Sequence, residues 1–203
     1  MKKILFSIIC LSVVVASNTS CQSRDNGHST ESQSDVVTQN ILSRRSVRQY
    51  AAQQVGRDTV DIILQAGINA PSAMNKQPWE VRVIRNSDLL AKINALNPDN
   101  RSHFYDAPTL IIVANDTTNV FSPFDAGLFS QNVMLSAESF GLGTVALGMV
   151  ARDLTGGTPE ANAVLAELKL SENYQVIIGI ALGYKAELPA AKPRDAQKVK
   201  IIE

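Results

Sequence analysis

The chain has 203 residues, enough for one ordinary domain, and its 45% hydrophobic and 19% charged residues are the balance of a globular protein with a core. The formal net charge is zero, so the overall charge gives no indication of a nucleic-acid partner. These values exclude a strongly basic binding protein and leave the activity open.

The first 20 residues have the pattern of a secretory signal. Lys2 and Lys3 form a short basic region, an apolar run covers residues 4–16, and small or polar residues then lead to Cys21. The run is too short to serve as a membrane-spanning anchor. Because a Cys after small residues resembles the bacterial lipoprotein signal, residues 1–20 are predicted to be a lipoprotein-type signal peptide and Cys21 the lipidated residue. A plain secretory signal is the alternative.

The segment after Cys21 predicts how the chain would be attached. Residues 21–34 are polar, with nothing to bury, and are expected to be a flexible tether, while residues 35–203 form the folded domain. Each acyl methylene buried in a bilayer contributes about 0.8 kcal/mol, so lipidation would anchor the chain firmly. We therefore expect a membrane-anchored lipoprotein of the cell envelope, facing the periplasm or the surface.

The folded part alternates helical and extended patterns. Helical periodicity and capping residues predict helices that begin at Asp35, Asp58, Ser87, Phe124 and Thr158. Alternating or continuous apolar runs predict strands over residues 79–84, 108–115 and 174–184, and residues 141–148 are expected to lead into a further short strand. The helix over 124–140 is mostly apolar or small and is expected to be central and buried. With several helices and only about four strands, the pattern predicts an α+β fold in which helices pack on one modest sheet.

A polar loop separates the second predicted helix from the first strand. Residues 69–80 have the sequence NAPSAMNKQPWE. A loop that only had to turn the chain would not need so many side-chain amides and hydroxyls. The composition therefore indicates that the loop has a binding role in addition to turning the chain.

Two basic segments lie at opposite ends of the folded part. Arg44, Arg45 and Arg48 accompany Ser46 near a helix end, and arginine forks with a hydroxyl match the geometry of a phosphate. Taken alone, however, this segment favours the capping alternative, a solvated cationic patch that satisfies the C-terminal carbonyls of the helix. The C-terminal segment supplies further cations beside prolines, which taken alone indicates a solvated terminus; these are Lys185, Lys192 and Arg194.

Several kinds of catalytic site are missing from the sequence. There is no GxSxG motif, and the two histidines, His28 and His103, are too isolated for a usual metal site or a Cys–His pair. His103 is expected to be a surface or packing residue. The glycines of residues 141–148 are wrongly spaced for a dinucleotide loop, and they are expected to precede a strand instead of linking a strand to a helix. A cofactor is therefore expected to perform the chemistry, with no catalytic side chain.

Four segments together resemble the nitroreductase family of flavin enzymes. They are RRSVRQY at residues 44–50, APSAMNKQPWEVRVI at 70–84, FDAGLFSQNVMLSAESFGLGT at 124–144 and IGIALGYKAELPAAKPR at 178–194. Their order and spacing also agree with that family. The resemblance implies a nitroreductase-like α+β fold with a central, mostly antiparallel sheet flanked by helices, in an intertwined homodimer.

The resemblance also implies FMN as the cofactor, bound at the subunit interface. Residues expected near its phosphate and ring edge are Arg44, Arg45, Ser46, Arg48, Lys192 and Arg194. Residues expected to reach the same flavin from the other subunit are Pro71, Ser72, Ala73, Met74 and Asn75. Residues expected beside the reactive ring nitrogen are Ala146, Leu147 and Gly148.

The implied activity is a two-electron, hydride-type reduction of nitroaromatics, quinones or similar small aromatic acceptors. NAD(P)H is the usual donor, but nicotinamides are scarce outside the cytoplasm, so an envelope redox protein or a membrane quinol is the alternative donor. Two other functions stay open: a related enzyme for reductive dehalogenation or flavin processing, and a flavin-binding lipoprotein with no catalytic role.

Overall fold

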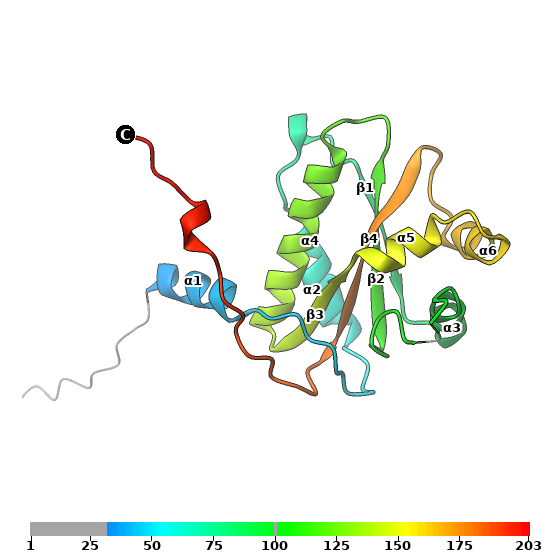
Figure 1. Ribbon diagram of the computed structural model, residues 1–203, viewed down its shortest axis with the longest axis horizontal. Helices are drawn as coiled ribbons and strands as arrows, with labels where there is room; N and C mark the ends of the chain where they lie inside the picture. Colours follow the sequence, from blue (N-terminus) through cyan, green and yellow to red (C-terminus); the bar gives the residue numbers. More distant parts are fainter. Residues whose placement is uncertain (1–31, 100) are drawn as a thin grey trace, which may run out of the picture. The chain divides into compact units, whose positions relative to one another are not determined.

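The computed structural model describes residues 32–99 and 101–203 (Figure 1). The predicted signal peptide, Cys21 and most of the predicted tether lie outside the described residues. The helices are α1 (Gln33–Ser43), α2 (Arg57–Ile68), α3 (Ser87–Ala95), α4 (Ser122–Ser139), α5 (Gly148–Leu154) and α6 (Pro159–Leu168). The strands are β1 (Trp79–Ile84), β2 (Thr109–Asp116), β3 (Leu142–Leu147) and β4 (Tyr174–Tyr184). Short 3₁₀ turns cover Ala73–Asn75 and Ala196–Lys198.

The four strands form one sheet in the order β1-β2-β4-β3, and every neighbouring pair is antiparallel. Trp79 pairs with Asn115, Thr109 with Leu182, and Leu142 with Tyr184. A bulge shifts the register of β2 between Val113 and Ala114. The predicted α+β fold with an antiparallel sheet flanked by helices is therefore confirmed.

Helices cover both faces of the sheet. Because successive side chains of a strand point to opposite faces, Ile111 and Val113 face α2 and α4, whereas Leu110 and Ile112 face α3, α5 and α6 (Figure 1). Seven of the eight residues of β2 are buried, as expected for a strand covered on both faces, and β1 is half-buried as predicted.

Helix α4 is the central helix that the sequence predicts, and buried residues line it from Ser122 to Ala137. It lies very close to α2, since a Cβ at Gly67 would come within 2.7 Å of the Val133 side chain. The helix ends at Ser139, one residue before the predicted end, and Gly141 follows with a φ of 71° that is costly for any residue with a side chain.

Several predicted helix starts are corrected. Helix α1 begins at Gln33 rather than at Asp35. Helix α2 is capped by Gly56 and not by Asp58, and α3 by Asn86 and not by Ser87, because the Asn86 side chain accepts the Leu89 N–H. Only the cap of α6 is as predicted: the Thr158 hydroxyl accepts the Ala161 N–H at 3.1 Å, with Pro159 next.

The apolar face of α1 is largely exposed. Val36, Val37, Ile41 and Leu42 are each about half exposed, and the helix is fastened to α4 by the Asn40 amide, which donates to the Leu135 carbonyl at 3.0 Å. None of the helices in the described part of the chain is both long and apolar enough to cross a membrane.

Candidate functional site

A pocket of about 200 Å³ brings the two basic segments of the sequence together. We call it the basic pocket. It is lined by Arg44, Arg45, Ser46, Arg48, Pro189, Ala190, Lys192 and Arg194. All six residues predicted near a phosphate therefore lie around one cavity, although about 140 residues of sequence separate the two segments.

Backbone pairing explains why these segments meet. After α1, residues 46–51 run beside the sheet: Ser46 forms a parallel bridge with Thr144 of β3, and Val47 N–H donates to the Thr144 carbonyl at 3.0 Å. Tyr50 then forms an antiparallel bridge with Lys185, just past β4. The segment thus lies between β3 and the start of the C-terminal tail, which returns to the pocket.

Three further contacts hold this arrangement. Val47 is fully buried, and β3 can approach it only because residue 143 is glycine: a Cβ there would lie 2.8 Å from the Val47 side chain. Lys185 binds both carboxylate oxygens of Glu138, at 2.8 and 2.9 Å, which ties the tail to the last turn of α4. The Arg48 N–H donates to the Glu187 carboxylate.

The three arginines of the pocket have different partners. Arg45 Nη1 donates to the Leu42 carbonyl at 2.5 Å and so caps the end of α1. Arg48 lies 5.8 Å above the ring of Tyr105, a cation–π distance. Arg44 Nη1 is buried and has no hydrogen-bond partner among the described residues. The capping alternative therefore accounts for Arg45 but not for Arg44, whose buried Nη1 is a hydrogen-bond donor without an acceptor.

The end of β3 lies beside the segment that carries Arg48. Because Ser46 pairs with Thr144 in parallel, the chain at Arg48 runs alongside Ala146. The strand ends at Leu147 and α5 begins at once at Gly148, so the expectation that this glycine-containing segment does not link a strand to a helix is wrong; α5 was not predicted. A Cβ at Gly148 would meet nothing within 4 Å, which leaves the backbone there open to a ligand.

The polar loop of residues 71–78, here the 71–78 loop, has a costly backbone. Met74, Asn75 and Gln77 have φ values of 55°, 53° and 48°, in the left-handed region where a residue with a side chain loses about 1–2 kcal/mol. The Ser72 hydroxyl accepts the Gln77 N–H at 3.0 Å, and Ala73 N–H donates to the Asp125 carboxylate at 3.2 and 3.3 Å. Such strain is typical of functional sites.

Within one chain, the 71–78 loop does not reach the basic pocket. None of the predicted loop residues lines that pocket; these are Pro71, Ser72, Ala73, Met74 and Asn75. The loop contacts Asp125 in the first turn of α4, whereas the tail contacts Glu138 in its last turn (Figure 1). Thirteen residues of helix separate these two contacts by about 20 Å. That the loop binds a cofactor of another subunit stays a prediction.

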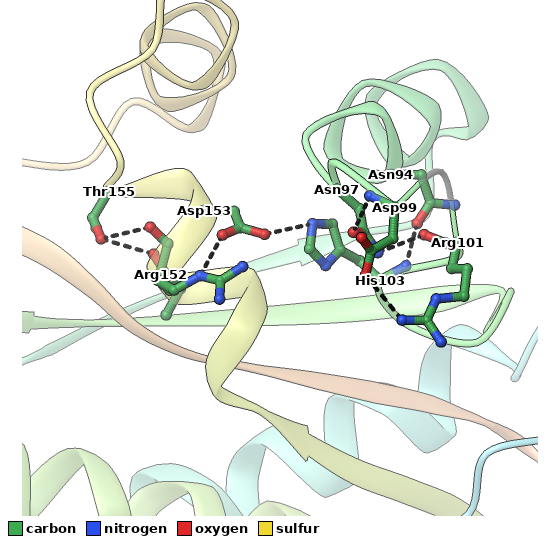
Figure 2. A network of polar contacts seen from close by, with 9 residues as sticks. Asn94, Asn97, Asp99, Arg101, His103, Arg152, Asp153 and Thr155 are labelled. Carbon is green, nitrogen blue, oxygen red and sulfur yellow. Dashed lines mark hydrogen bonds and ion pairs between the residues drawn. The ribbon is translucent and has the colours of Figure 1, made fainter.

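His103 lies in a network that the sequence did not indicate (Figure 2). It is 7% exposed, so the surface alternative is wrong, and its Nε2 lies 3.1 Å from Asp153 Oδ2 without the alignment of a hydrogen bond. Arg152 Nε contacts the other Asp153 oxygen at 2.6 Å. Burial lowers the pKa of the imidazole, and Asp153 opposes only part of that shift. No sequence motif links residues 50 positions apart.

The same network borders a second pocket, of about 250 Å³, beside the basic pocket. His103, Tyr105 and Met149 are among its lining residues. Arg48 of the basic pocket lies over the ring of Tyr105, which lines the second pocket, so the two pockets meet at this pair. Among the described residues, no group of three or more His, Cys, Asp or Glu side chains could hold a metal ion.

Comparisons with known proteins agree with this geometry. The model of the Nitroreductase family matches residues 41–99 and 95–184. A Methanothermobacter thermautotrophicus protein, whose name contains the words NAD(P)H nitroreductase, is 33% identical over 77% of this chain and 81% of its own. An FMN reductase of Bacillus subtilis, specific for NAD(P)H by its name, is 26% identical over 80% of this chain and 71% of its own.

A solved structure is also similar. The Bacteroides fragilis nitroreductase with bound FMN has a TM-score of 0.75 and 30% identity, and the match covers 82% of this chain and 98% of that one.

Proposed function

The chain belongs to the nitroreductase family, and on that premise we propose that it is an FMN-dependent oxidoreductase. It passes two electrons from a donor to a nitroaromatic, a quinone or a similar small aromatic acceptor. The bound FMN of the Bacteroides fragilis structure and the FMN reductase of Bacillus subtilis support the cofactor.

The buried Nη1 of Arg44, which has no hydrogen-bond partner among the described residues, is the observation in the basic pocket that carries this proposal. Five cations and one hydroxyl line a cavity in which the described residues place no carboxylate. Charge-assisted hydrogen bonds from guanidinium forks are the contacts that a phosphate monoester prefers. The residues present therefore fit the phosphate of FMN, and those that would hold it are Arg44, Arg45, Ser46, Arg48, Lys192 and Arg194.

FMN, when bound, supplies the ability to accept and release two electrons as a hydride equivalent. The chain's own residues bind and orient it. Ala146, Leu147 and Gly148, at the end of β3, would lie beside the flavin ring; the space beside Gly148 is open, and Arg48 would add positive charge nearby. No side chain of this chain is assigned a covalent or acid–base step.

We propose further that the active form is a homodimer. The 71–78 loop and the basic pocket lie at opposite ends of α4, so one chain does not bring both to one cofactor. A second copy supplies the missing loop, with the Ser72 hydroxyl and the Asn75 amide directed at the polar ring edge. Exposed apolar residues of α1 and of the C-terminal tail support a contact between copies; they include Val36, Ile41, Leu42, Ile201 and Ile202.

The electron donor and the location are proposed together. If Cys21 carries lipid, the domain works in the cell envelope, where NAD(P)H is scarce and a redox protein or a membrane quinol is the donor. Stopped-flow reduction of the FMN-loaded protein distinguishes the two cases. Fast reduction by NADPH would contradict the envelope donor without affecting the cofactor assignment.

The proposal is tested on full-length protein purified in detergent. We expect a yellow dimer with one FMN per chain that is bleached by a reductant and reoxidised anaerobically by a nitroaromatic or a quinone. Arg194→Ala should weaken FMN binding by about 1.5–3 kcal/mol, and Ser46→Ala by about 0.5–1.5 kcal/mol. Lys198→Ala, on the same tail but outside the pocket, is the control.

Two outcomes would overturn this function. A colourless protein that ignores added FMN would remove the cofactor. A yellow protein that no acceptor reoxidises would instead indicate a flavin-binding lipoprotein without catalytic activity.

A further inference from the structure

Where the strained 71–78 loop enters β1, its Pro78 carbonyl accepts the Asp116 N–H at 3.1 Å, but residues 71–77 are fastened to the rest of the fold at one point. Their other hydrogen bonds are local, such as Asn75 N–H to the Ser72 carbonyl at 2.9 Å and Lys76 N–H to the Ala73 carbonyl at 3.1 Å. Among the described residues, the only hydrogen bond from residues 71–77 to the chain beyond residue 79 runs from Ala73 N–H to Asp125. Local bonds shape the turn, but only this contact sets its place on α4.

Asp125 is an unusual residue for such a contact. It is 4% exposed, and its two carboxylate oxygens share the single Ala73 N–H at 3.2 and 3.3 Å. A buried carboxylate with one donor is costly, since each oxygen can accept more than one hydrogen bond. Its place in the first turn of α4 offsets part of this cost, because the helix N-terminus favours negative charge. An apolar residue at this position would pack without that cost.

We propose that Asp125 is a positioning residue: by binding the Ala73 N–H it holds the 71–78 loop in its left-handed conformation and thereby sets FMN binding in the neighbouring subunit. The cofactor half of this inference rests on the proposed function. The carboxylate touches neither the basic pocket nor its residues, so its effect on the cofactor passes through the loop alone. Met74, 75% exposed at the tip of the turn, is the side chain that this anchor presents outward.

The first test measures the anchor without the cofactor. Hydrogen exchange of the FMN-free, full-length protein is followed in peptides that cover residues 71–77. Asp125→Ala should raise exchange there about tenfold, since one charge-assisted hydrogen bond is lost. Asp125→Asn keeps an acceptor oxygen of the same shape and should change exchange less than about threefold. Ser130→Ala removes another buried hydrogen bond of α4, to the Ala126 carbonyl, and is the matched control with no change in the loop.

The second test measures FMN affinity in the same variants. Asp125→Ala should lose about tenfold, with Asp125→Asn and Ser130→Ala close to the unchanged protein. Unchanged exchange in Asp125→Ala would overturn the anchor. Faster exchange with unchanged FMN affinity would overturn the effect on the cofactor. An unchanged chain that binds no FMN would overturn the proposed function and the cofactor half, while the exchange data would still decide whether Asp125 holds the loop.

Mixed dimers decide whether the effect crosses the interface. Chains with Asp125→Ala are co-expressed with differently tagged Arg194→Ala chains, and the dimer carrying both tags is purified. If the loop serves the partner's cofactor, one site combines both defects and the other has an intact pocket and an intact loop, so one FMN per dimer binds with unchanged affinity. If Asp125 acts within its own chain, both sites are defective and no tight site remains, which would overturn the proposal.

Discussion

The basic pocket is held by backbone pairing, whereas residues 71–77 of the 71–78 loop are held by one carboxylate. Residues 46–51 pair with β3 and with the chain at the end of β4, so Ser46 and Arg48 lie on a segment that is joined to the sheet, while Lys192 and Arg194 lie on the tail that follows Lys185. The loop leaves α2 and returns to β1 through three residues with positive φ. The pocket is therefore fixed by backbone pairing with the sheet. The loop instead contains three residues whose backbone angles are unfavourable for a residue with a side chain.

The two regions carry different kinds of unfavourable free energy. In the pocket, the cost is electrostatic: five cations gather around a small cavity, and one guanidinium nitrogen is buried without a partner. In the loop, the cost is conformational. A bound anion would offset the electrostatic cost of the pocket. The strained conformation of the loop would serve a contact with the neighbouring subunit. This contrast is tested by substitutions that remove either the electrostatic cost of the pocket or the conformational cost of the loop.

The largest effect is expected from Arg44→Met. The substitution keeps an apolar stem but removes the guanidinium with its buried, unpartnered Nη1, so FMN binding should weaken by about 1.5–3 kcal/mol while the FMN-free protein becomes no less stable. FMN titration and urea unfolding of the FMN-free protein measure the two quantities. A protein that loses stability and keeps its FMN affinity would show that Arg44 is a structural residue and that the pocket does not bind the phosphate through it.

Gly143→Ala should disturb the backbone of the pocket. The added methyl would lie 2.8 Å from the Val47 side chain, which is fully buried and cannot move aside, so about 1–3 kcal/mol of unfolding free energy should be lost. FMN affinity should fall as well, because residues 46–48 are pushed away from β3.

Gly127→Ala is the matched control for this substitution. It adds the same methyl in open space on α4 and should instead stabilise the protein by about 0.5–1 kcal/mol. Unfolding midpoints at one fixed protein concentration compare the two variants. Equal effects would mean that the approach of Val47 to β3 does not matter.

The smallest effect is expected from Gln77→Gly in the loop. Residue 77 has a φ of 48°, so glycine should remove strain and stabilise the protein by about 0.5–1 kcal/mol. The same substitution at Gln65, exposed within α2, should destabilise by about 1 kcal/mol. Denaturant unfolding of both variants checks the sign, and a loss of stability in Gln77→Gly would mean that the loop is not strained at this residue.

Much of the architecture could be predicted because it follows from local patterns. Alternation located β1, a continuous apolar run located the doubly covered β2, and Thr158 with Pro159 marked the start of α6. The helix starts predicted at Asp58 and Ser87 were wrong because a neighbouring residue took the capping position. Helix α5 was missed because the chain passes from strand to helix without a separating turn signal.

The sequence by itself determined which residues the candidate site has: cations near both ends of the folded part, and a loop rich in amides and hydroxyls between a helix and a strand. These features depend only on residue types, so the sequence alone reveals them. Only the tertiary structure decided that the cations share one cavity, that Asp125 anchors the loop, that His103 meets Asp153, and that one chain keeps loop and pocket apart. Those outcomes depend on sheet pairing and on the length of α4, which join residues that no local pattern connects.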